Sequence, residues 1–197
     1  MVANIASLAA TFAMGGDLGW LLWPYWIQSV VIGWYARQRM LALRDFSTDG
    51  FTTGRGTDRR QVPETDAGKR STADFFAFHY GAFHAGYLVY LCAEHWPGSW
   101  LDLAVLLGCG LSFVVAQRQT FAEQLAHDAR GRPNLGRMMF LPYIRVVPMH
   151  LLIASAASLG GTGAMLLFTA LKTAGDLLLD RLDRRPLADA VAAAGGR

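Results

Sequence analysis

The sequence predicts an all-α, polytopic transmembrane helix bundle with six helical segments arranged as three hairpins. Hydrophobic residues make up 53% of the 197 residues, which is more than most soluble domains of this size contain. The stretch FFAFHYGAFHAGYLVYLCA, residues 75–93, contains no Lys, Arg, Asp or Glu. As a helix this stretch is long enough to cross the ~30 Å hydrocarbon core of a bilayer.

The third observation behind this fold class is the placement of basic residues. All 18 Lys and Arg residues fall within 37–70, 118–145 and 172–197, and none lies in the short turns near Gly15, Trp96 and Gly161. Cytoplasmic segments accumulate Lys and Arg, so both termini are predicted to be cytoplasmic. Five spans are the alternative, but they would place the basic tail on the opposite side.

The first hairpin is predicted from residues 2–14, a short apolar stretch, and residues 18–40. Aromatic residues crowd one end of the second segment, as at a membrane interface: Trp20, Trp23, Tyr25 and Trp26. Residues 41–73 are rich in Gly, Thr, Asp and Arg and show no apolar period. We expect a solvated cytoplasmic loop there.

The second hairpin begins with the histidine-bearing helix, which Ser71, Thr72 or Asp74 would cap and the turn His95-Trp96-Pro97-Gly98 would close. Residues 99–117 form the fourth predicted span. Residues 118–142 are polar and then semi-apolar, which favours a segment lying along the membrane surface.

The last apolar region, 146–171, is interrupted by the Gly-rich run 159–163, and is interpreted as the third hairpin. Residues 183–197 would form a cytoplasmic tail. Together, residues 1–197 are predicted to be a single integral membrane domain.

Imidazoles inside a membrane segment indicate a functional site. His79 and His84 lie five residues apart, about 140° around an ideal helix, so they face different neighbours. With His150, and Cys109 or water as a fourth ligand, they would suit zinc, iron, copper or haem. Equally open is a site without any metal, because Tyr80, His84 and Tyr87 share a helix face and can satisfy one another.

Other polar residues offer further hypotheses. Ser112 follows Gly110 in a Gly-x-Ser arrangement, a weak candidate for the nucleophile of an intramembrane hydrolase. Arg145, near the predicted membrane boundary, would bind a lipid phosphate, pair with an acid or extend to the headgroups. Lys172 and Asp176 lie four residues apart and can pair with each other.

Five stretches resemble, in order, a bacterial family of small multi-pass membrane proteins of unknown function: YWIQSVVIGWYARQRM, FFAFHYGAFHAGYLVY, GLSFVV, FLPYIRVVPMHLLI and LFTALKTAGDLLLDRLD. The most specific segments are Phe-His-Tyr-Gly and Arg-x-x-Pro-x-His. The resemblance implies that the family pattern includes His79, His84, Arg145, Pro148, His150, Lys172 and Asp176. In that pattern an acid often stands where this chain has Gln28, and a histidine where it has Cys109. The resemblance implies no activity.

Three function classes follow. The first is a membrane protein of the bacterial inner membrane that binds a metal or haem through histidines, as an oxidoreductase or hydrolase. The second is a non-catalytic lipid-binding or assembly subunit, and the third is a small oligomeric transporter. The expected partners are the lipid bilayer and further copies of the chain. Nucleic acid is not expected, because no basic cluster is interleaved with aromatic residues.

Overall fold

The computed structural model describes residues 19–151, 153, 163, 166–167 and 169–178, and these are mostly helical. The chain divides into two compact units, Leu22–Tyr143 and a second unit in which Met1–Leu21 joins Ile144–Arg197. The predicted segment 2–14, the tail 183–197 and all of the Gly-rich run except Gly163 lie outside the described residues. The choice between five and six segments therefore stays a prediction.

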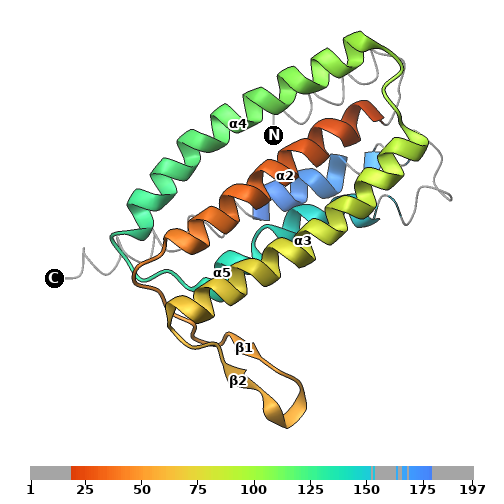
Figure 1. The fold of residues 1–197 in the computed structure, drawn as a ribbon. Helices are drawn as coiled ribbons and strands as arrows, with labels where there is room; N and C mark the ends of the chain where they lie inside the picture. Colours follow the sequence, from red (N-terminus) through yellow and green to blue (C-terminus); the bar gives the residue numbers. More distant parts are fainter. Residues whose placement is uncertain (1–18, 152, 154–162, 164–165, 168, 179–197) are drawn as a thin grey trace. The chain divides into compact units, whose positions relative to one another are not determined.

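Three long helices make up most of the first unit: α2 (Gly19–Ala42), α3 (Asp66–Glu94) and α4 (Trp100–Asp128). Within this unit α2 runs antiparallel to α3 and parallel to α4 (Figure 1). The pairs that join α2 to α3 are Trp23–His95, Trp26–His84, Ser29–Tyr80 and Arg37–Asp74, and those that join it to α4 are Tyr35–Phe121 and Arg39–Asp128. The helix predicted over 18–40 is confirmed as α2.

The start of α3 differs from the prediction. Thr65 is the N-cap, and its hydroxyl accepts a hydrogen bond from the Gly68 amide. Thr72, one of the predicted caps, instead donates its hydroxyl to the Gly68 carbonyl inside the helix. The prediction of Ser71, Thr72 or Asp74 as cap was wrong because the apolar pattern begins there, whereas the helix already begins at Asp66, in a polar stretch that Thr65 caps.

One face of α3 is buried. Its buried side chains recur every three or four residues, as one helix face requires: Lys69, Thr72, Ala73, Phe76, Tyr80, His84, Tyr87 and Leu91. The Tyr80 ring lies against Gly33 of α2, where a Cβ atom would overlap the ring. On the remaining circumference, Phe75, Phe78 and Val89 are 55%, 79% and 70% exposed.

The start of α4 agrees with the prediction, and its end does not. Ser99 and Asp102 form a reciprocal capping box, in which the Ser99 hydroxyl accepts from the Asp102 amide and the Asp102 carboxylate accepts from the Ser99 amide. The helix then continues past Gln117 to Asp128. Hydropathy ended the predicted span at Gln117, but the polar residues that follow favour a helix and reach the Arg39 side chain.

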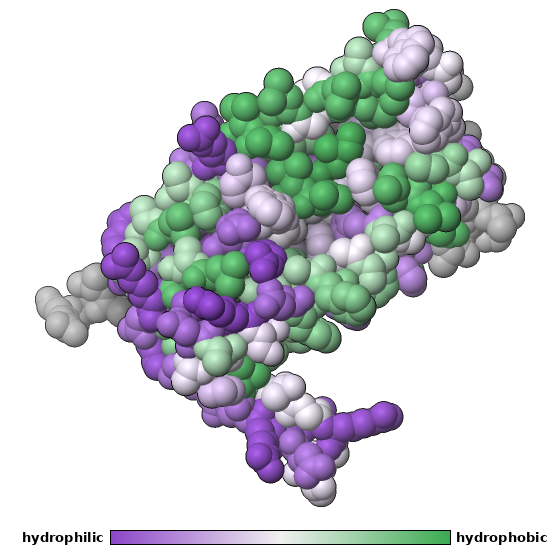
Figure 2. Space-filling view, viewed as in Figure 1, coloured by the Kyte–Doolittle hydropathy of each residue, from purple (hydrophilic) through white to green (hydrophobic). Residues whose placement is uncertain are grey.

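Among the described residues, α4 is the one helix that is both long enough and apolar enough to cross a membrane. Only 6% of its most apolar 18-residue stretch is buried. Figure 2 shows the hydrophobic surface over α4 and the adjoining part of α3, with hydrophilic residues at the end of this unit where the chain connects α2 to α3. α2 and α3 fall short of the same test, and six spans are not supported.

The predicted loop 41–73 is more structured than its composition indicates. It contains the antiparallel strands β1 (Thr52–Thr53) and β2 (Arg60–Gln61), joined by the 3-10 turn η1 (Gly56–Asp58), before α3 begins. The predicted surface segment 118–142 holds the last turns of α4 and the short helix α5 (Leu135–Phe140), which Asn134 caps. We call residues 43–65 and 129–140 the cap.

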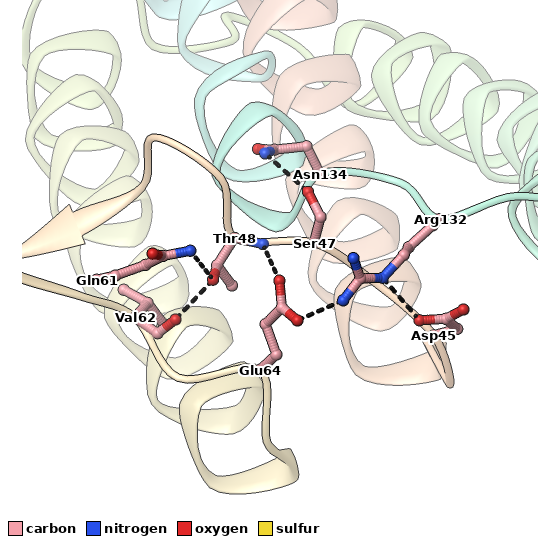
Figure 3. A network of polar contacts seen from close by, with 8 residues as sticks. All are labelled: Asp45, Ser47, Thr48, Gln61, Val62, Glu64, Arg132 and Asn134. Carbon is pink, nitrogen blue, oxygen red and sulfur yellow. Dashed lines mark hydrogen bonds and ion pairs between the residues drawn. The ribbon is translucent and has the colours of Figure 1, made fainter.

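Two separate stretches of the chain meet in the cap (Figure 3). The Ser47 amide donates to the Pro133 carbonyl at 3.0 Å, and the Leu135 amide donates to the Ser47 carbonyl at 2.9 Å. Phe51 packs against Gly136, which leaves no room for a side chain there. The cap is thus a folded element at the charged end of the helices.

The second unit is described in part. Residues 144–151 and 169–178 are helical, and a Cβ atom at Gly175 would lie in van der Waals contact with Ile144. This packing brings the two helical pieces of the unit together.

Candidate functional site

The histidine-bearing face of α3 forms a hydrogen-bonded cluster with α2. His84 Nε2 lies 2.9 Å from Ser29 Oγ, and the Tyr80 hydroxyl lies 2.7 Å from the same oxygen. His84 Nδ1 lies 2.8 Å from the Tyr80 carbonyl. A carbonyl only accepts, so Nδ1 carries the proton, and a neutral imidazole then accepts from the Ser29 hydroxyl. The Tyr80 hydroxyl has two acceptors on the same residue, Ser29 Oγ and, at 3.1 Å, the Ser29 carbonyl. Every polar proton in this series of hydrogen bonds has an acceptor.

This arrangement refines the predicted Tyr80–His84–Tyr87 ladder. The shared face is confirmed, since all three side chains are buried and the His84 ring stacks on Tyr80 with centroids 4.3 Å apart. The hydrogen bond runs through Ser29 of α2, which the sequence interpretation missed. A serine amid apolar helix residues carries little signal, because its partner lies 55 residues away.

Ser29 and His84 also have the separation of a nucleophile and its general base. Their exposed fractions are 2% and 5%, however, so a substrate would reach the hydroxyl only if the two helices separated. Among the described residues, every buried side-chain nitrogen and oxygen has a hydrogen-bond partner. The cluster is therefore complete without a ligand.

His79 lies on a different side of α3 from His84, as the helical spacing predicts. Its ring is exposed, and Nδ1 is 2.8 Å from the Tyr143 hydroxyl. Phe75 stacks on the His79 ring at 5.4 Å. His79 therefore contributes to the contact between α3 and Tyr143, which lies after the end of α5.

The predicted metal ligands are distributed as follows. His79, His84 and Cys109 belong to the first unit and His150 to the second. Within either unit, the described residues contain no group of three or more His, Cys, Asp and Glu side chains placed to hold a metal ion. Cys109 is a free thiol on α4. A metal or haem held by His79, His84 and His150 stays a prediction.

The remaining predicted site residues take local roles. The Ser112 hydroxyl is exposed and donates to the Cys109 carbonyl of its own helix at 2.7 Å, as a packing serine does. In the second unit, Lys172 Nζ lies 3.4 Å from Asp176, which confirms that predicted pair. Arg145 Nη1 lies 3.2 Å from the other Asp176 oxygen, so this arginine pairs with an acid.

The charged end of the first unit holds a buried ion pair that the sequence gave no reason to expect. Arg39 Nε and Nη2 donate to the two Asp128 oxygens at 2.6 and 2.7 Å. The side chains are 19% and 4% exposed. Such a two-bond pair fixes geometry as well as charge, and it joins the end of α2 to the end of α4.

Arg132 joins the two stretches of the cap (Figure 3). It donates to Asp45 at 3.1 Å and to Glu64, whose other oxygen accepts from the Thr48 amide at 2.9 Å. The hydrogen bond to Asp45 raises the pKa of Arg132, and the charge of Glu64 adds to this effect. The guanidinium stays charged and holds the two stretches of the cap together.

A depression of about 410 Å³ lies between the last turns of α2 and the first turns of α3. Six residues line it: Arg37, Leu41, Asp66, Lys69, Arg70 and Asp74. Arg37 donates to Asp74 at 2.7 Å, and Lys69 lies 2.7 Å from Asp66. We call it the boundary pocket, because the charge-free part of α3 begins directly after Asp74.

These features define a mostly helical protein with one exposed apolar helix, a neutral hydrogen-bonded helix interface and a charged cap. The chain belongs to a family of unknown function (DUF6498), whose family model matches residues 1–193. No curated protein and no solved structure matches the chain. The predicted membership of an uncharacterised family is confirmed. Bacterial origin and the two specific segments stay predictions.

Proposed function

We propose that this chain is an integral membrane protein without a catalytic site of its own, in which α2, α3 and α4 cross the bilayer and the charged end of α2 and α3, beside the cap, binds a lipid or an assembly partner. The observation that carries this proposal is the exposure of α4. Its most apolar stretch is only 6% buried. A soluble protein rarely exposes such a surface to water, whereas a bilayer requires one.

The lengths of the charge-free helix sections support the same placement. Residues 19–36 of α2 and 75–93 of α3 contain no charged side chain and are about 27 and 29 Å long at 1.5 Å per residue. Both sections match the ~30 Å hydrocarbon core. The two sections lie side by side. At one end Arg37 and Asp74, the charged residues that border them, form an ion pair, and towards the other end Trp23 Nε1 donates to the His95 carbonyl at 2.6 Å.

Basic residues support the orientation of the cap. In the first unit all Lys and Arg residues lie between 37 and 70 or between 118 and 137, and the turn 95–99 has none. By the positive-inside rule the cap would face the cytoplasm. Tryptophans 96 and 100, exposed at 66% and 87%, would lie at the opposite interface.

A non-catalytic role is favoured by the state of the histidines. His84 has a partner for each ring nitrogen, and His79 has Tyr143. Hydrogen-bonded polar groups of this kind strengthen contacts between membrane helices. We therefore favour a lipid-binding or assembly role over the metal enzyme.

Cysteine labelling in intact membranes tests this proposal. Cys92 and Cys109 are the two natural cysteines, both in charge-free sections. With Arg59→Cys in the hairpin added to a Cys92→Ser chain, a membrane-impermeant maleimide should label the hairpin in inverted vesicles only. Cys109 should react only after detergent is added.

Two outcomes would contradict the proposal. One is release of the chain from the membrane fraction by alkaline carbonate. The other is labelling of Cys109 by the impermeant reagent without detergent. Exchanging Arg60 for cysteine in place of Arg59 provides a matched hairpin position, and it should show the same sidedness.

A further inference from the structure

The boundary pocket contains more positive than negative charge. Three of its side chains are basic (Arg37, Lys69, Arg70) and two are acidic (Asp66, Asp74). Each acid lies within ion-pair distance of one base, Asp74 of Arg37 and Asp66 of Lys69. The remaining positive charge of the pocket is that of Arg70.

Lys69 is held in place by the fold. Its side chain is 9% exposed, and Nζ donates to the Leu43 carbonyl at 2.5 Å and lies 5.8 Å from the centre of the Phe46 ring. It also lowers the pKa of Asp66, first through its hydrogen bond and then through its charge, with a smaller contribution from Arg70. Asp66 thus stays ionised and holds the Lys69 side chain on the pocket wall.

Arg37 and Arg70 are the cations open to a ligand. The guanidinium of Arg37 gives Nη2 to Asp74 and has further N–H groups, since an arginine carries five. Arg70 is exposed, and it forms no ion pair in the part of the chain that the structure describes. Planar guanidinium groups match the geometry of phosphate oxygens.

An apolar surface continues directly from the pocket. Arg70, Asp74 and Phe78 are four residues apart on α3, so they follow one another on a single helix face. Phe78 is 79% exposed, and Phe75 beside it is 55% exposed. A charged pocket followed by exposed aromatic rings has the polarity order of a phospholipid, with its headgroup above its acyl chains.

We propose that the boundary pocket binds a phosphate ester, with Arg70 and Arg37 as its contacts, and that its source is a phospholipid whose acyl chains lie along Phe75 and Phe78. The lipid source rests on the proposed membrane placement of α3. The phosphate chemistry of the pocket does not depend on that placement. A soluble phosphate is the other source of the same ligand group.

The test is titration of phosphatidylglycerol onto the purified full chain in detergent, followed by native mass spectrometry. Arg70→Gln should weaken binding about fivefold, since one basic residue near a lipid headgroup contributes about that factor. Arg70→Lys should retain most of the affinity because it keeps the charge. Arg59→Gln is the matched control, an exposed arginine of the hairpin outside the pocket.

A second arm separates the two sources of phosphate. If inorganic phosphate in excess displaces the lipid from the parent chain but does not change the amount of lipid bound to Arg70→Gln, the pocket binds a soluble phosphate. If it does not displace the lipid, the lipid source is supported. Equal lipid binding by Arg70→Gln and Arg59→Gln would overturn the proposed phosphate site in the boundary pocket. This outcome is independent of what the labelling of Cys109 shows about the membrane.

Discussion

The middle of the α2–α3 interface and the capped end of the same helices are held by different chemistry. In the middle, Ser29, Tyr80 and His84 join the helices through neutral hydrogen bonds. At the capped end, α2 is held by charged groups, Arg37 to Asp74 and Arg39 to Asp128. The change occurs within about two turns of α2.

This difference teaches where each section of the helices is solvated. Ionised pairs are stable where water can reach part of them, and they are costly in hydrocarbon. Neutral hydroxyl and imidazole groups are tolerated in hydrocarbon when they find partners on another helix. The positions of the two chemistries therefore fit the proposed membrane boundary near Arg37 and Asp74.

Removal of the buried carboxylate at the capped end should have the largest effect. Asp128→Ala leaves the Arg39 guanidinium, which is 19% exposed, without its two-bond partner. Loss of one partner from such a pair should lower the free energy of unfolding by about 3 kcal/mol. Chemical unfolding in detergent micelles, followed by tryptophan fluorescence, measures the change.

Glu123→Ala is the matched control for this prediction, an exposed acid on the same helix. It should change the free energy of unfolding by less than about 0.5 kcal/mol. Equal losses in the two variants would mean that the Arg39–Asp128 pair does not hold the end of α4 to α2.

Loss of the serine hydroxyl in the middle of the interface should have an intermediate effect. Ser29→Ala removes the group that both His84 Nε2 and the Tyr80 hydroxyl contact. Hydrogen bonds between membrane helices contribute about 1 kcal/mol or less, so we expect a loss of that order in the same unfolding assay. Added salt should not alter this loss, since the groups are neutral.

Ser112→Ala is the control for Ser29→Ala, because its exposed hydroxyl bonds only within α4 among the contacts that the structure describes. Its effect on stability should be close to zero. A cost as large as that of Ser29→Ala would remove the distinction between an interface serine and a packing serine.

Weakening of the cap should have the smallest effect. Arg132 is 52% exposed, and ion pairs exposed to solvent contribute little to stability. Arg132→Gln should speed hydrogen exchange at the Thr48 and Leu135 amides by up to about fivefold. High salt should raise the exchange rates of the parent chain towards those of the variant, because exposed charges are screened.

Arg130→Gln is the control for the cap, since Arg130 is exposed and donates to the Ala126 carbonyl of its own segment. It should leave exchange at Thr48 and Leu135 unchanged. Faster exchange in both variants would indicate a general charge effect in place of a specific contact.

Local sequence signals located the helices well where an apolar or charge-free run marks them. The apolar run predicted to begin at residue 99 marked the start of α4, and the charge-free run from residue 75 marked the apolar part of α3. The same signals missed the polar helix turns at 66–74 and 118–128, because hydropathy identifies membrane sections and not helix ends. The folded cap was missed because its two stretches are far apart in sequence.

The sequence alone determined the mostly helical class, the family and the gathering of basic residues in a few sections of the chain. The tertiary structure decided which polar groups become partners. Ser29 meets His84 across 55 residues, and Arg39 meets Asp128 across 89. Such pairs depend on the register between packed helices, which local propensity does not encode. The first of these pairs makes His84 a contact between α3 and α2.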